Sequence, residues 1–140
     1  MIEENPFIVS LYLRGKDLDP KFVTAQLGVI PTLSHYKGEK RITSIGTEYA
    51  TKIGIWAITT SSQSKSLSDH IAELASKFEL HGKALNEITG VEESYIDIFI
   101  SSLKNKCGSD TSEFEFNVDS IAALARLTVP IRFTVTFVEE

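Results

Sequence analysis

The three histidines are the residues most able to do chemistry, because imidazole is the commonest general base and a common metal ligand. His70 and His81 lie eleven positions apart in the sequence, so on one continuous helix they would be roughly 16 Å apart. They cannot share a metal. His70 and Glu73 have the i, i+3 spacing of two ligands on one helix, but no second pair of this kind completes a four-ligand site. We therefore expect no metal centre.

Two other side chains could be reactive without a metal. His35 precedes Tyr36 and Lys37 in a predicted loop, where it could act in chemistry or contact an anion. Cys107 is the single cysteine, and nearby lysines would favour its thiolate, but no general base or orienting group accompanies it. No serine occupies a G-x-S-x-G turn. The sequence therefore predicts a non-catalytic protein without a cofactor.

The stretch RGKDLDPKFVTAQLG could be a binding loop or a structural joint between a strand and a helix. A phosphate loop would need glycines flanking a lysine, and a calcium loop would need a closing glutamate after Asp17 and Asp19. Neither pattern is complete. Asp19 instead suits an N-cap, Pro20 suits the first helical position, and Gly28 suits a C-terminal stop. We expect a short helix here with no chemical role.

Composition limits the class of protein. With 140 residues, 42% of them hydrophobic, the chain is long enough to form one domain, residues 1–140, with a core of its own. One cysteine excludes a disulfide framework, and no apolar run reaches the roughly 20 residues that span a membrane. The acidic N-terminus lacks the features of a signal peptide. We expect a cytoplasmic protein with no membrane partner.

The charge is unevenly distributed along the chain. Residues 1–66 hold eight basic and six acidic side chains, whereas residues 67–140 hold six basic and thirteen acidic ones. A net charge of −5 repels nucleic-acid phosphates at long range, so we expect no nucleic-acid partner. A basic protein partner fits this charge better, although an acidic surface also serves solubility alone.

Hydrophobic periodicity predicts the elements that must position these residues. Period-two or continuous apolar runs predict strands over 6–14, 41–49, 53–59, 94–101, 112–117 and 130–140. Helical periodicity predicts helices over 20–27, 67–78 with a continuation over 82–90, and 117–127. In the last strand the inward side chains are predicted to be Ile131, Phe133, Val135 and Phe137.

This order mixes hairpins with crossover connections. It predicts an α+β two-layer sandwich, in which a mainly antiparallel sheet of five or six strands carries helices on one face.

Several short motifs give the chain a family resemblance. They are Gly15 with Leu18-Asp19-Pro20, then Leu27-Gly28, Pro31-Thr32, Lys37-Gly38 and Gly54-Ile55-Trp56. With these motifs the chain resembles, over nearly its whole length, a bacterial family catalogued as domain of unknown function 4279. The polar stretch between Lys37-Gly38 and Trp56 departs from that pattern. The resemblance implies the fold above and a bacterial origin, and it implies no activity or cofactor.

Two binding functions follow, and the first is protein binding. A small acidic bacterial domain without catalytic groups fits an immunity protein that neutralises a cognate, basic toxin. The acidic side chains on or beside two predicted strands would then face the toxin; they are Glu92, Glu93, Asp97, Glu113 and Glu115.

The alternative is a small-ligand sensor or regulatory domain. Its pocket would lie between the irregular loop and the sheet, with an apolar wall and a few convergent cations. The side chains that would line it are His35, Tyr36, Lys37, Lys40, Arg41 and Trp56.

Overall fold

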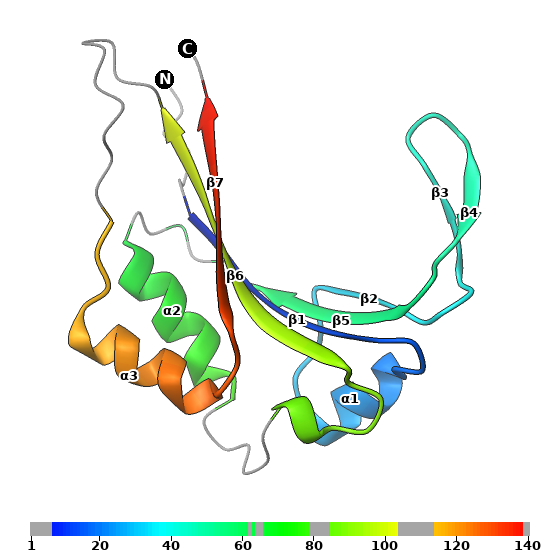
Figure 1. The fold of residues 1–140 in the computed structure, drawn as a ribbon, viewed down its shortest axis with the longest axis horizontal. Helices are drawn as coiled ribbons and strands as arrows, with labels where there is room; N and C mark the ends of the chain where they lie inside the picture. Colours follow the sequence, from blue (N-terminus) through cyan, green and yellow to red (C-terminus); the bar gives the residue numbers. More distant parts are fainter. Residues whose placement is uncertain (1–6, 62, 64–65, 79–84, 104–113, 139–140) are drawn as a thin grey trace.

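The structure is a computed structural model that describes residues 7–61, 63, 66–78, 85–103 and 114–138. Strands and helices alternate along the chain (Figure 1). The strands are β1 (Phe7–Gly15), β2 (Leu33–His35), β3 (Lys40–Ile42), β4 (Glu48–Ala50), β5 (Gly54–Thr59), β6 (Glu93–Leu103) and β7 (Ile131–Val138). The helices are α1 (Pro20–Leu27), α2 (Leu67–Ser76), the 3-10 turn η1 (Leu85–Glu87) and α3 (Val118–Leu127).

Five strands form the main sheet in the order β2-β5-β1-β6-β7. The pairs β2–β5, β5–β1 and β1–β6 are antiparallel, while β6 and β7 are parallel. Helix α3 lies between β6 and β7 in the chain and belongs to the crossover that a parallel pair requires. The predicted α+β sandwich with a mainly antiparallel sheet is confirmed.

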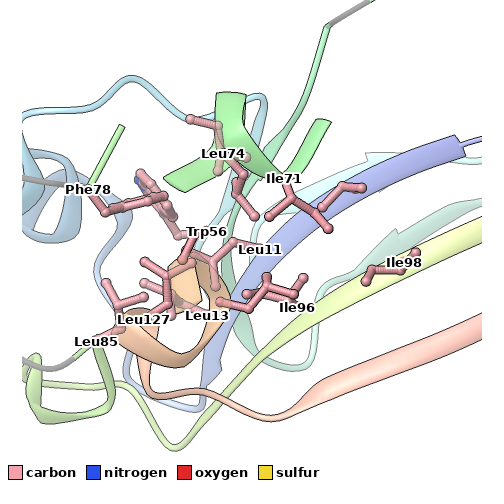
Figure 2. Close-up of a cluster of buried hydrophobic side chains, with 14 of the residues drawn as sticks. Leu11, Leu13, Trp56, Ile71, Leu74, Phe78, Leu85, Ile96, Ile98 and Leu127 are labelled. Atoms are coloured by element: carbon pink, nitrogen blue, oxygen red, sulfur yellow. The ribbon is translucent and has the colours of Figure 1, made fainter. Parts of the chain in front are cut away.

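The three helices cover one face of this sheet (Figure 1). Strand β1 directs Val9, Leu11 and Leu13 toward them, and each of these side chains is fully buried. Trp56 from β5, with Ile96 and Ile98 from β6, extends the same layer toward α2 and α3 (Figure 2). Alternation along the strands thus places the core between the sheet and the helices.

The joint between β1 and α1 has the capped geometry that the sequence predicts. Asp19 is the N-cap, and its Oδ1 accepts a hydrogen bond from the Lys21 N–H at 3.0 Å. Pro20 occupies the first turn, and Gly28 ends the helix in the left-handed region at φ 68°. The sequence signals at both ends of this helix were therefore sufficient to locate it.

The region 41–49 differs from the single irregular strand that we predicted. It forms most of a hairpin, in which β3 and β4 pair with Arg41 opposite Tyr49. The chain reverses between them because Thr43 and Thr47 bond across the turn, where Gly46 has a φ of 87°. Figure 1 shows this hairpin projecting from the β2–β5 side of the sheet, away from the helices.

Two other predictions were wrong. Within the strand predicted over 112–117, residues 114–117 are irregular. Phe114 and Phe116 pack edge-on or tilted against Phe7 and Phe133, so aromatic packing rather than strand pairing accounts for their alternation. Within the predicted helical continuation over 82–90, the described part contains only the turn Leu85–Glu87.

The closing strand forms, but its apolar side chains are not enclosed. Ile131, Phe133 and Val135 lie on the helix side of the sheet and remain exposed. Strand β7 is an edge strand, and the helices do not extend far enough to cover it. The side chain of Phe137 lies outside the described residues.

None of the helices in the described part of the chain is both long and apolar enough to cross a membrane.

Candidate protein interface

The open face of the sheet is the surface on the side opposite the helices (Figure 1). Strand register determines which side chains it carries, because alternate residues of a strand point to opposite faces. From β1, β6 and β7 they are Ile8, Ser10, Tyr12, Arg14, Glu93, Tyr95, Asp97, Phe99, Arg132 and Thr134; from β2 and β5 they are Leu33, His35, Ile55, Ala57 and Thr59.

A stack of aromatic and cationic groups crosses the open face from the central strand β1 to the edge strand β7. Tyr12 and Tyr95 are directly opposite on β1 and β6, and their rings stack with centroids 5.2 Å apart at 22°. The Arg132 guanidinium from β7 lies 3.8 Å from the centre of the Tyr95 ring. Such cation–π contacts hold an arginine in place while leaving its outer side available. Three neighbouring strands thus present one ordered group.

The carboxylates of the open face are paired with cations or hydroxyls. Glu93 Oε1 lies 3.5 Å from Arg14 Nη1 and 3.3 Å from Arg132 Nη2. Asp97 Oδ1 accepts a hydrogen bond from the Thr134 hydroxyl at 2.9 Å. Because exposed ion pairs contribute little stability, we expect these contacts mainly to orient the side chains. The face combines two cations with two anions.

The five predicted acidic residues do not form one patch. Glu93 and Asp97 share the open face, whereas Glu92 lies just before β6 and accepts a hydrogen bond from the Lys16 backbone N–H. Glu115 lies in the segment before α3, whose neighbouring Phe114 packs on the helix side. Glu113 lies outside the described residues. Of the four described residues, the structure therefore brings two together on the open face.

The predicted ligand residues do not converge on one pocket either. Trp56 is fully buried on the helix side, and its Nε1–H donates to Thr24 Oγ1 at 3.0 Å. His35 pairs with Ile55 and points to the opposite face. Tyr36, Lys37 and Lys40 are exposed around the start of the hairpin. The strand register therefore places Trp56, the predicted apolar wall of the pocket, on the helix side and away from the predicted cationic side chains.

The β3–β4 hairpin is fixed at its base. The Thr51 hydroxyl donates to the Tyr36 carbonyl at 2.6 Å, and the Gly38 N–H donates to the Thr51 carbonyl at 2.8 Å. Arg41 Nη2 donates to the Ser34 carbonyl at 3.0 Å and lies 2.9 Å from a Glu39 oxygen. The exposed apolar side chains beyond this base are Ile42, Ile45 and Tyr49. The hairpin is therefore held in place by hydrogen bonds at its base and exposes apolar side chains beyond it.

One row of the open face holds two buried nitrogens with no hydrogen-bond partner among the described residues. They are Arg14 Nε and His35 Nδ1. Both side chains flank Ile55, since His35 and Arg14 are its partners in the β2–β5 and β1–β5 ladders. Buried polar atoms normally have partners, so this row is under-satisfied.

The other candidates for chemistry have structural surroundings or lie outside the described residues. His70 is buried, its Nδ1 is 2.9 Å from Thr60 Oγ1, and its ring packs near Phe7. Glu73 Oε2 accepts a hydrogen bond from the Ser61 N–H at 2.7 Å. Both contacts join α2 to the segment after β5. His81 and Cys107 fall outside the described residues.

Sequence reasoning missed Tyr12, Tyr95, Arg14 and Arg132 as site residues. Alternation within the first strand did place Tyr12 and Arg14 on the face opposite the core. What it could not give was the strand order, which brings Tyr95 and Arg132 beside them.

Comparison with known proteins gives a family but no relative of known function. The chain belongs to the family described as Domain of unknown function (DUF4279), whose family model matches residues 5–137. No curated protein and no solved structure matches the chain.

Proposed function

We propose that this member of the DUF4279 family is a non-catalytic protein-binding module, and that its partner docks on the open face. The observation that carries the proposal is the Tyr12–Tyr95–Arg132 stack. It lies on a sheet face that none of the described helices covers (Figure 1).

The residue types of the stack are those that dominate protein interfaces. Tyrosine and arginine are enriched among the side chains whose truncation costs most binding energy, and such side chains cluster near the centre of an interface. Here they are held by stacking and by the ion pairs of Glu93 before any partner arrives. A preordered surface loses less side-chain entropy on binding.

The surroundings of the stack also suit a macromolecular partner. The braced β3–β4 hairpin rises on the same side as the open face, and its exposed Ile42 and Ile45 would add apolar contacts at the rim. The buried nitrogens of Arg14 and His35 would favour a partner with hydrogen-bonding groups after small side-chain movements. These features are spread across the sheet, which favours a protein over a small molecule.

The partner class that we propose is a bacterial toxin domain, neutralised in the cytoplasm by this chain as an immunity protein. The small size and the net charge of −5 support this choice, since opposite charge accelerates association with a basic partner. On the open face, Glu93 is already paired with Arg14 and Arg132. A basic partner must therefore displace these arginines to form an ion pair with Glu93.

The test is binding to the protein encoded by the adjacent gene. We expect a complex with wild type, and we expect Tyr95→Ala to weaken it at least about tenfold, as for a central interface residue. Phe22→Ala, which removes an exposed aromatic ring from α1 on the helix side, is the matched control for loss of aromatic surface. Equal binding by wild type and Tyr95→Ala, both folded by circular dichroism, would contradict the open-face proposal.

A small-ligand sensor remains a prediction with less support. Its apolar wall was to be Trp56, which is buried on the helix side and bonded to Thr24.

A further inference from the structure

An apolar surface lies along the outer edge of the sheet, on the helix side and distinct from the open face. We call it the β7 edge surface. It consists of Ile121 (56% exposed) from α3 with Ile131 (37%), Phe133 (53%) and Val135 (46%) from β7, and Ile121 and Ile131 line the same hollow. Monomeric proteins rarely expose so many neighbouring apolar side chains without a partner.

Helix α3 contributes a second apolar stripe to this surface. Its buried side is formed by Ser120, Ala123, Leu124 and Leu127. Its exposed side repeats Val118, Ile121, Ala122 and Ala125, which is the i, i+3, i+4, i+7 spacing of a packed helix face. A helix that is apolar on both sides is normally covered on both sides. Ile121 and Ala125 also line a hollow of about 500 Å³ that reaches Ile131 at the start of β7.

The backbone of β7 offers hydrogen-bonding groups on the same edge. The Ile96 N–H donates to the Pro130 carbonyl at 2.9 Å. In the parallel β6–β7 ladder, the even-numbered residues of β7 therefore direct their backbone groups toward β6. The N–H and C=O groups of Ile131, Phe133 and Val135 therefore point away from β6. No described strand pairs with them. At the other edge of the sheet, β2 has three residues, whereas β7 has eight. Long edge strands without a cover are the ones that pair with another chain.

We propose that the occupant of the β7 edge surface is a second copy of this chain. The two β7 strands would pair antiparallel about a two-fold axis perpendicular to the sheet, and the two main sheets would become continuous. Pairing about a two-fold axis brings the same patch of each copy together, so the patch must be complementary to itself.

The charge distribution of the edge meets that requirement. Arg132 is the one charged residue within β7, and it points to the open face, where it contacts Glu93 and Tyr95. On α3, Asp119 lies in the first turn and Arg126 in the last. The proposed two-fold axis makes the two α3 helices antiparallel. The acidic end of one helix therefore lies toward the basic end of the other. Pairing centred on Phe133 places Arg132 opposite Thr134 of the other copy, so no like charges oppose each other along the strand.

The apolar side chains of the edge and the pairing of its backbone together provide the area for a homodimer. From their exposed fractions, the four side chains present roughly 350 Å² per copy, so two copies would bury roughly 700 Å² before any backbone is counted. Pairing of two eight-residue strands and the exposed Ala122 and Ala125 of α3 add to this area, toward the roughly 1,200 Å² at which specific interfaces begin. The two-fold axis leaves both open faces accessible on the same side, so the dimer does not depend on the function proposed above.

Sedimentation velocity of the purified protein over a wide concentration range tests the proposal. We expect the wild-type protein to sediment as a dimer of two 15.5 kDa chains. Phe133→Lys should raise the dissociation constant of the dimer at least about tenfold. The matched control is Ile45→Lys, which introduces the same charge on the hairpin, at a side chain that is more exposed than Phe133. This variant should leave the dimer intact.

Two further variants keep the test decisive if Phe133→Lys misfolds. Ile121→Lys alters an exposed position of α3 and should also weaken the dimer. Val135→Pro removes an outward N–H without removing a β6–β7 hydrogen bond, so it tests strand pairing itself. A wild type that stays monomeric throughout, whether or not another protein binds this edge, would overturn the proposal. A dimer that resists all three folded variants would overturn it equally.

Discussion

At the scale of single residues, three glycines allow three segments to meet at one point. A Cβ on Gly15 would overlap the Gly90 carbonyl oxygen, and a Cβ on Gly54 would lie 2.5 Å from the Leu18 carbonyl oxygen. Gly15 and Gly54 are also opposite each other in the β1–β5 ladder. The end of β1, the start of β5 and the turn before β6 can approach because these positions have no side chain.

Gly15→Ala should therefore destabilise the protein strongly. The clash is with backbone, which cannot rotate away, so we expect a loss of about 3 kcal/mol or more in the free energy of unfolding. Urea denaturation followed by tryptophan fluorescence would measure it. Gly46→Ala is the control: a Cβ there meets open space, and its positive φ of 87° should cost only about 1 kcal/mol. Equal losses in the two variants would contradict the close-approach explanation.

The joint shows which residue-level features the sequence could predict. Asp19, Pro20 and Gly28 were predicted correctly because caps act on neighbours within a few positions. The contact between Gly15 and Gly90 was not predictable, because its partners are 75 positions apart in the sequence. The Tyr12–Tyr95 stack was missed for the same reason.

At the scale of elements, alternation identified strands more reliably than it identified their surroundings. Strand β6 is present where it was predicted, with Ile96, Ile98 and Ile100 buried. The same pattern in Phe114 and Phe116 accompanies irregular backbone that packs against Phe7 and Phe133. Period-two spacing shows which side chains share a face, but it does not show whether a neighbouring strand pairs with them.

The hairpin illustrates an element that depends on a few contacts at its base. Two short strands are not stable alone, so β3–β4 must be held by its connection to the sheet. Thr51 is buried at that connection, and its hydroxyl donates to the Tyr36 carbonyl. The turn residues within 32–56 fit a loop and a hairpin equally well, so the sequence alone does not distinguish the two.

Thr51→Val should loosen the hairpin without unfolding the sheet. The change preserves the shape of the side chain and removes one hydrogen bond, which costs about 0.5–1.5 kcal/mol. We expect faster amide hydrogen exchange in β3 and β4, measured by mass spectrometry or NMR. Amides of the β1–β6 ladder serve as the internal control and should keep their protection. Unchanged exchange in the hairpin would mean that other contacts brace it.

At the scale of the whole molecule, one sheet offers three different surfaces. The helix side is closed by the core, the open face carries the aromatic and cationic stack, and the β7 edge carries exposed apolar side chains. The layer arrangement was predictable from the order of elements. The strand order was not, because the first strand lies at the centre and the last lies parallel to β6 at an edge.

The acidic carboxyl half of the chain can act on a partner in two ways, through its total charge or through particular positions. Asp97→Lys and Glu115→Lys separate them, because each changes the net charge from −5 to −3. Asp97 lies on the open face beside Thr134, whereas Glu115 lies in the segment before α3. Both variants should slow association with a basic partner to a similar, salt-dependent extent, since long-range attraction depends on total charge.

Only Asp97→Lys should also accelerate dissociation, because only that position would be covered in the complex. We expect at least about a tenfold weaker complex for Asp97→Lys than for Glu115→Lys, measured by surface plasmon resonance against the product of the adjacent gene at low and moderate salt. Thermal denaturation must first show that both variants remain folded. If the two variants bind equally weakly at every salt concentration, net charge alone explains the effect and the partner does not dock on the open face.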